Sequence, residues 1–190
     1  MNAPRSSALA AFPVRGAIGL AGLAAFAWAV ATYAVGRVPL DPGFPTALAA
    51  LVGAGILTRR YGIPLPGNGF ASYVLGVMVF AVLLRGGAFA VLVAPAAMLG
   101  GDLLLRRLPW PAAASNAAHL SAGTALVGVA YELIGGATGA GALSAANVGP
   151  LVALLLLLPA VVNGTFYLEL ATSERTIAWV DARLTARWEA

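Results

Sequence analysis

The apolar segment 112–133 carries polar side chains whose spacing could place them around a ligand or an ion. Ser115 and His119 are four residues apart, and Asn116 and His119 are three apart. On a helix these spacings put the side chains on one face, and Gly123, one turn beyond His119, lets another helix approach that face closely. The sequence therefore predicts a polar face turned into a helix bundle. It either lines a pocket for a ligand or ion, or makes hydrogen bonds between helices.

A second polar feature lies in segment 148–170, where Asn163 follows Pro159 by about one turn. Proline has no amide hydrogen, so it frees the backbone carbonyl of Leu155 and bends the helix. The Asn163 amide would satisfy this loosened backbone or a neighbouring helix. Alternatively, it forms a second wall of the pocket that Asn116 would line.

The remaining charges lie near the ends of the apolar segments. Asp102 precedes Arg106 by four residues, which is the favoured order for a helical ion pair, and we expect this pair at a membrane interface. On the predicted outer side the charges sum to zero and could pair into a lid: Arg37, Asp41, Arg85 and Glu132.

No familiar catalytic or metal-binding pattern is present in the sequence. There is no cysteine and a single histidine, and we find no paired carboxylates, nucleophile triad, phosphate-binding loop or zinc spacing. We therefore expect no enzyme activity, no metal and no cofactor. A pigment of the chlorophyll type stays open as an alternative, because it needs only one axial ligand, and Ser115 would leave room for a macrocycle beside His119.

The elements that must position these residues are long and apolar. Hydrophobic residues make up 61% of the 190 and charged residues 9%, against about 25% charged in soluble domains. Too few polar groups remain to coat a soluble core of this size. Six runs approach the roughly 20 residues that a transmembrane helix needs, namely 16–36, 42–58, 70–84, 86–105, 112–133 and 148–170.

These runs predict an all-α, polytopic membrane protein, a bundle of six transmembrane helices with a C-terminal amphipathic helix. Residues 1–15 would form a cytoplasmic N-terminal segment, 16–170 the transmembrane domain and 171–190 a cytoplasmic tail. In that tail Ile177, Val180, Leu184 and Trp188 share one helical face. The tail would lie on the membrane surface or pair with a partner.

Arginine positions predict the orientation. All eleven basic residues are arginine, and six spans with a cytoplasmic N-terminus place nine of them inside and two, Arg37 and Arg85, outside. Both termini are therefore expected in the cytoplasm, here of a bacterial inner membrane. The arginines form no patch, so we expect no nucleic-acid partner. Alternatively, residues 1–31 are a cleaved signal peptide ending in a small-x-small site.

Segment 63–69 stands out because it contains two prolines and two glycines before the short run 70–84. This composition forbids a regular helix. We expect a tight cytoplasmic connection, and the alternative is a re-entrant segment that lines a cavity.

Several of these motifs together resemble the membrane-associated sensor (MASE-type) domains, which precede HD-GYP or GGDEF output domains. The resemblance extends from about Arg60 to Leu170 and is carried by IPLPG at 63–67, RRLPW at 106–110, NAAH at 116–119, VAY at 129–131, Gly135, Gly136 and Asn163. It implies that Asn116, His119, Tyr131 and Asn163 line a sensory pocket. Since the sequence ends at Ala190, we expect either a longer gene product or a copy that acts through another protein.

Three functions fit these observations. The first is a non-enzymatic sensory or ligand-binding membrane module that signals to a cytoplasmic partner. The second is an accessory subunit of a larger membrane complex, in which pigment could be present. The third is the substrate-binding component of a small-solute transporter. The expected partners are membrane lipid and either other membrane subunits or a second copy of the chain.

Overall fold

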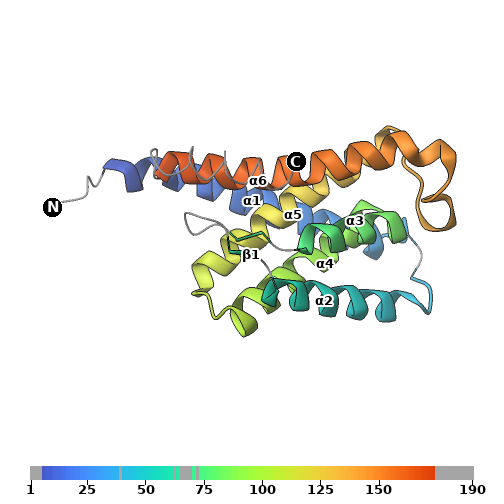
Figure 1. Cartoon of the computed structure of the whole chain (residues 1–190), viewed down its shortest axis with the longest axis horizontal. Helices are drawn as coiled ribbons and strands as arrows, with labels where there is room; N and C mark the ends of the chain where they lie inside the picture. Colours follow the sequence, from blue (N-terminus) through green and yellow to red (C-terminus); the bar gives the residue numbers. More distant parts are fainter. Residues whose placement is uncertain (1–5, 39, 62, 65–69, 72, 174–190) are drawn as a thin grey trace.

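The computed structural model describes residues 6–38, 40–61, 63–64, 70–71 and 73–173. They form a bundle of long helices that run roughly along the longest axis of the molecule (Figure 1). The helices are α1 (Ser6–Ala34), α2 (Phe44–Arg60), α3 (Val74–Arg85), α4 (Gly87–Gly100), α5 (Trp110–Leu133) and α6 (Val148–Ser173). A π-helical turn, η1 (Gly101–Leu105), continues α4, and two short 3-10 turns, η2 (Gly139–Gly141) and η3 (Ala145–Asn147), precede α6.

Each of the six predicted apolar runs overlaps one of these helices, so the all-helical class is confirmed. Three helical segments are long and apolar enough to cross a membrane, namely Pro13–Ala34, Gly87–Leu105 and Ala145–Thr172. The helix Val74–Arg85 is apolar but shorter. Among the others, α2 has only 17 residues, and α5 is long enough but carries the polar residues described above.

The N-terminal helix is longer than the sequence predicted. We expected the first helix to begin near Gly16, but α1 begins at Ser6 and continues through Pro13. Helical backbone therefore covers most of the predicted N-terminal segment. The predicted amphipathic tail, from residue 174 onward, lies outside the described residues.

A small β ladder lies between α2 and α3. Strand β1 (Ile63–Pro64) pairs antiparallel with β2 (Phe70–Ala71), so that Ile63 lies opposite Ala71. The two ends of the predicted irregular connection therefore pair with each other as short strands. The intervening residues 65–69, on which the tight and re-entrant alternatives depend, lie outside the described residues.

Helices α4 and α5 form the centre of the bundle, with α1 and α6 against α5 and with α2 and α3 against α4. They cross at Gly87 and Gly128, where a Cβ on Gly128 would lie 2.7 Å from the Gly87 Cα. Gly22 on α1 lies equally close to Ala118 on α5. Small residues therefore let these helix backbones approach closely.

The six helices alternate in direction, so that like ends gather. The start of α1, the end of α2, the start of α3, the end of η1, the start of α5 and the end of α6 share one end of the bundle. We name it the basic end, because five of the seven described arginines lie there: Arg15, Arg59, Arg60, Arg106 and Arg107. Arg37 and Arg85 lie toward the opposite end.

Candidate functional site

Near the basic end, the predicted polar face of α5 contacts a carboxylate on α6. His119 Nε2 lies 2.8 Å from Glu169 Oε2, and Ser115 Oγ donates to the same oxygen at 3.0 Å. Glu169 is 7% exposed and His119 is 3% exposed. A carboxylate this far from water needs hydrogen-bond donors around it, and α5 supplies two.

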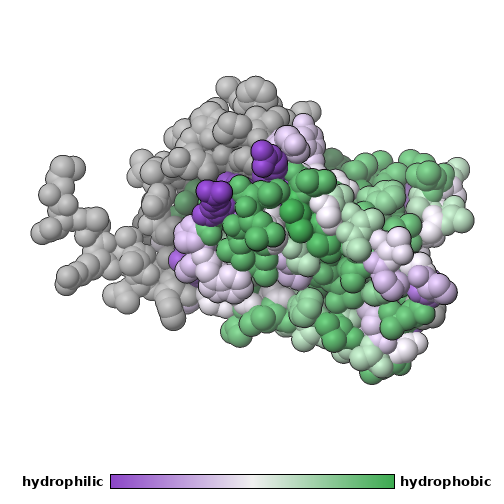
Figure 2. Space-filling model, turned by 90° about the horizontal axis from the view of Figure 1, so that it is seen from below, coloured by the Kyte–Doolittle hydropathy of each residue, from purple (hydrophilic) through white to green (hydrophobic). Residues whose placement is uncertain are grey.

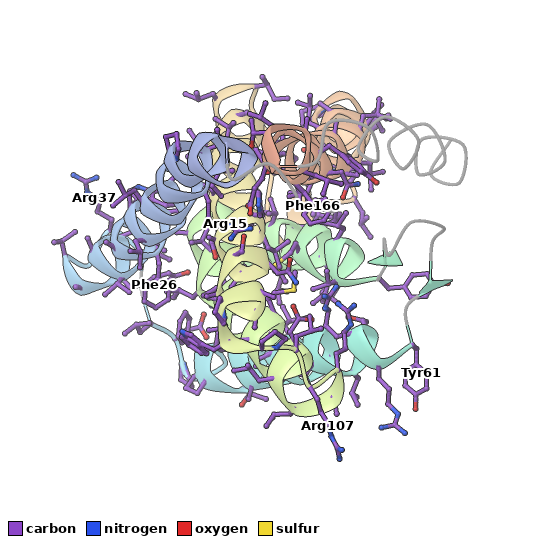
Figure 3. All side chains as sticks on the ribbon, turned by 90° about the vertical axis from the view of Figure 1, so that its left-hand side faces the viewer. Arg15, Phe26, Arg37, Tyr61, Arg107 and Phe166 are labelled. Atoms are coloured by element: carbon purple, nitrogen blue, oxygen red, sulfur yellow. The ribbon has the colours of Figure 1, made fainter. Side chains whose placement is uncertain are left out.

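A third donor comes from α1. Arg15 Nε donates to Glu169 Oε1 at 2.6 Å, although the Arg15 side chain itself is 63% exposed. Figure 3 shows Arg15 between α1 and the helices α5 and α6. We name Arg15, Ser115, His119, Thr165 and Glu169 the His119 cluster. The Glu169 carboxylate connects α1, α5 and α6. Its contact with Arg15 joins residues that are 154 positions apart in the sequence.

Glycine sets the distance at which this cluster forms. A Cβ on Gly123 of α5 would lie 2.5 Å from Val162 Cγ2 of α6, so only glycine permits this approach. The close approach that the sequence predicted one turn beyond His119 is therefore confirmed. Phe166 also packs against the His119 ring, with centroids 5.9 Å apart.

The hydrogen bonds of Thr165 let the cluster accommodate one additional proton without moving heavy atoms. His119 Nδ1 lies 3.0 Å from Thr165 Oγ1, which also lies 2.9 Å from the Val162 carbonyl. If the Thr165 hydroxyl donates to Nδ1, His119 is neutral with its hydrogen on Nε2. If the hydroxyl turns to the carbonyl, Nδ1 carries its own hydrogen and His119 is an imidazolium. The chemistry that this geometry allows is reversible proton binding.

A second buried carboxylate contacts α5 at Asn116, three residues before His119. Asp102 is fully buried, and its Oδ1 accepts bonds from Arg59 Nε at 2.9 Å, Arg59 Nη2 at 2.5 Å and Arg106 Nη1 at 3.3 Å. Its Oδ2 accepts from Asn116 Nδ2 at 2.7 Å. We name Arg59, Asp102, Arg106 and Asn116 the Asp102 cluster. It ties α2, η1 and α5 together.

The π-helical turn explains why Asp102 points inward. At η1 the backbone hydrogen bonds join residues five apart instead of four, since the Arg106 N–H donates to the Gly101 carbonyl. Such π-helical turns shift the helix register. Gly101 allows the Arg59 side chain to lie directly against the η1 backbone. The chain then leaves η1 through Arg107, whose φ of 54° is left-handed. The predicted Asp102–Arg106 pair forms, but it is deeply buried on the Asp102 side, and Arg59 makes the shorter contacts.

Tyr131, another predicted pocket residue, lies far from His119. It is twelve residues beyond His119 on α5, or roughly 18 Å along the axis. Its hydroxyl contacts Asn147 and donates to the Ala137 carbonyl, within the loop before α6. Tyr131 therefore does not line a pocket with His119. Asn163 lies half-buried on α6, and its place in a pocket stays a prediction.

The predicted outer lid forms in part. Arg85 donates two bonds to Asp41, at 2.6 and 2.8 Å, and stacks near the rings of Phe44 and Phe89. Its hydrogen bonds lower the pKa of Asp41 below the ordinary value. Glu132 instead accepts from the Gly87 amide at the start of α4. Arg37 extends away from the bundle (Figure 3).

Sequence reasoning missed the residues that complete both clusters. The sequence assigned no role to Glu169, and it used Arg15 and Arg59 only to predict the orientation. One signal was available for Glu169, because Thr165 and Glu169 are four residues apart and so share a face of α6, as Ser115 and His119 do on α5. No local spacing connects Arg15 or Arg59 to their partners.

His119 uses both ring nitrogens in hydrogen bonds inside the bundle. An axial ligand needs one nitrogen directed at the metal, so this geometry does not fit the pigment alternative. No group of three or more metal-ligating side chains occurs among the residues that the structure describes.

We compared the chain with models of known protein families, with curated proteins and with solved structures, and found no match. The resemblance to MASE-type sensor domains therefore stays an expectation that rests on the sequence motifs.

Proposed function

We propose that this chain is a six-span integral membrane protein that serves as a non-enzymatic sensory module for a cytoplasmic partner. The observation that carries the proposal is the His119 cluster. It joins three helices through one buried carboxylate on α6, only four residues before that helix ends at Ser173. A change in this cluster would act directly on the helix that leads into the tail.

The membrane location is supported by the outer surface of the helices. Large apolar side chains are exposed at mid-helix, including Leu20 at 70%, Leu126 at 62% and Leu156 at 66%. Figure 2 shows hydrophobic residues over much of one face, with the strongly hydrophilic ones toward its ends. In water such a surface would drive aggregation, whereas in a bilayer it contacts lipid tails.

The arginines support the orientation. The basic end holds five described arginines and the opposite end two. Positive residues favour the cytoplasmic side, so we place the basic end, and with it both termini, in the cytoplasm of a bacterial inner membrane. Both buried carboxylates then lie near the cytoplasmic leaflet, where a proton or a partner from the cytoplasm reaches them.

Accessory-subunit function is the second candidate, and the exposed face of α6 favours it. Leu155, Leu156 and Leu157 are 50%, 66% and 43% exposed. A neighbouring membrane subunit could pack against these exposed leucines. Lipid tails could cover them equally well. Purification in lipid nanodiscs separates the two candidates, because an accessory subunit stays bound to a complex of fixed stoichiometry.

The topology can be tested with single cysteines, since the chain has none of its own. Thr138→Cys, in the exposed loop after α5, should react with a membrane-impermeant maleimide in whole cells. Arg60→Cys, at the exposed basic end, should react only after the membrane is opened. The reverse pattern, or labelling of both sites from outside, would refute the orientation.

The signalling role can be tested by a spin label on a cysteine at Ala190 in the full chain in nanodiscs. Glu169→Gln weakens the His119 cluster and should change the mobility of the label. Glu132→Gln is the matched control, because it changes the same group type at the opposite end of the bundle. If the two variants give the same spectrum as the parent, the His119 cluster does not act on the tail.

A further inference from the structure

A groove runs between α1, α4 and α5 on the side of α5 that faces away from His119. Its volume is about 430 Å³, which is within the range of about 300–1,000 Å³ for ligand sites. The walls are apolar and the lining residues include Gly19, Phe26, Leu99, Trp110 and Ser121. From Trp110 to Ser121 the groove follows α5 for roughly 16 Å.

Ser121 carries the one hydroxyl among the residues that line this groove. The residue is 2% exposed. No hydrogen bond of this hydroxyl is seen within the part of the chain that the structure describes, and its oxygen is not among the enclosed atoms that lack a partner, so it opens onto the groove. A hydroxyl that faces an apolar space gains from a hydrogen-bond partner, and this one lies at the far end of the groove from Trp110.

We propose that this groove binds a lipid-soluble molecule with one extended hydrocarbon chain and a single hydroxyl or carbonyl group, which pairs with Ser121. The chain would lie along α5 toward Trp110. This inference rests on the proposed membrane location, because such a molecule would enter from the lipid. It gives the sensory module a class of ligand.

The shape of the groove agrees with a slender chain. Gly19 has open space where its Cβ would be, with no atom within 4 Å, whereas Gly22 one turn later lies against Ala118. The groove is therefore open at Gly19 and closed behind it by the α1–α5 contact. Trp110 is 60% exposed and forms the rim.

The groove also shares α1 with the His119 cluster. Arg15 lies one turn before Gly19 on α1, and it donates to Glu169. A molecule held between α1 and α5 would therefore press on the helix that carries Arg15. This provides a physical connection between ligand binding and the cluster near the end of α6.

The test uses tryptophan fluorescence of the full chain in lipid nanodiscs. Trp28, Trp179 and Trp188 are replaced by Phe, so that Trp110 is the single reporter. The probe is ω-bromododecanol, whose bromine quenches a tryptophan that it contacts. With its hydroxyl at Ser121, its bromine end lies toward Trp110, and quenching should saturate as the groove fills.

Two variants identify the site and the hydrogen bond. Gly19→Leu fills the groove and should abolish saturable quenching, while Gly16→Leu, on the same helix with equally open space, should keep it. Ser121→Ala should weaken binding of the bromoalcohol by about 2- to 10-fold, the effect of one hydrogen bond. It should leave 1-bromododecane, which has no hydroxyl, unchanged.

Three results would overturn the proposal. Quenching that rises linearly without saturation, equally in all variants, means that bulk lipid chains fill the groove. Absence of quenching means that a neighbouring helix or subunit covers it. Equal loss of both probes in Ser121→Ala means that the hydroxyl is not recognised. The cysteine-labelling experiment is independent, so a failed ligand test leaves the proposed topology standing.

Discussion

Removing one partner from the buried Arg59–Asp102 pair should destabilise the bundle far more than removing both. Arg59 is 5% exposed and Asp102 is fully buried, and two of the three arginine bonds to Oδ1 come from Arg59. Asp102→Leu removes the carboxylate that accepts two hydrogen bonds from the Arg59 guanidinium. Arg59→Met leaves the carboxylate with Arg106 and Asn116 alone.

The magnitude follows from the burial of both charges. Breaking a buried ion pair by removing one partner costs about 3–5 kcal/mol, whereas exchanging both partners for apolar residues is often neutral. In the double variant the Asn116 amide still loses its acceptor, which costs about 1–3 kcal/mol. We therefore expect each single variant to lose about 3–5 kcal/mol and the double variant about 1–3 kcal/mol.

The assay is reversible unfolding of the purified chain in mixed micelles by added denaturing detergent, followed by circular dichroism. The four proteins form a double-mutant cycle, and the coupling free energy is the sum of the single effects minus the double effect. It should exceed about 3 kcal/mol. If the double variant loses the sum of the two single losses, Arg59 and Asp102 act independently and the reasoning is wrong.

Three further predictions follow from other contacts. Gly128→Leu should destabilise the bundle by about 1–3 kcal/mol or more, because the new side chain would meet the α4 backbone. The control, Gly76→Ala, has open space around its Cβ and should be neutral or stabilising. Both effects are measured by melting temperature. Asn147→Ala should cost about 1–3 kcal/mol and speed hydrogen exchange in the loop 134–147, since the 1% exposed amide holds that loop together. Asp41→Asn should remove the loss of stability that the parent shows as the pH falls below the ordinary carboxyl pKa of 3.8, measured by melting temperature at each pH.

The sign of the Asp41 effect comes from its lowered pKa. A carboxylate with a lowered pKa in the folded state contributes stability above its unfolded value, and this is lost as pH falls through the folded value. A parent protein whose melting temperature does not fall more steeply than that of Asp41→Asn would contradict the pairing with Arg85. A melting temperature of Gly128→Leu that is no lower than that of Gly76→Ala would contradict the close crossing of α4 and α5. Unchanged exchange in Asn147→Ala would show that other contacts hold the loop.

Within single helices, the sequence predicted the side chains that share a face. Helical periodicity placed Ser115 and His119 together, and both contact Glu169. The close approach at Gly123 was also predictable, because a glycine on a polar face has a direct steric consequence. These inferences hold because the spacing of two residues along a helix fixes the directions in which their side chains point, whatever the helix packs against.

Between helices, the sequence alone could not choose partners. Asp102 has Arg106 four residues away, but its shorter bonds come from Arg59, 43 positions earlier, because the η1 turn changes the direction of its side chain. Tyr131 shares a helix with His119 and was grouped with it, yet it is roughly 18 Å away and bonds to the loop before α6.

Composition and hydropathy alone determined the helical class and the approximate positions of six helices, because the apolar runs are long and lack the strict alternation of strands. Only the tertiary structure decided which charges meet. Two carboxylates near one end of the bundle draw their donors from α1, α2 and α5 and from Arg106 just after η1. The packing of small residues, not local spacing, sets those distances. The groove beside Ser121 exists for the same reason, since it is the space that three packed helices leave between them.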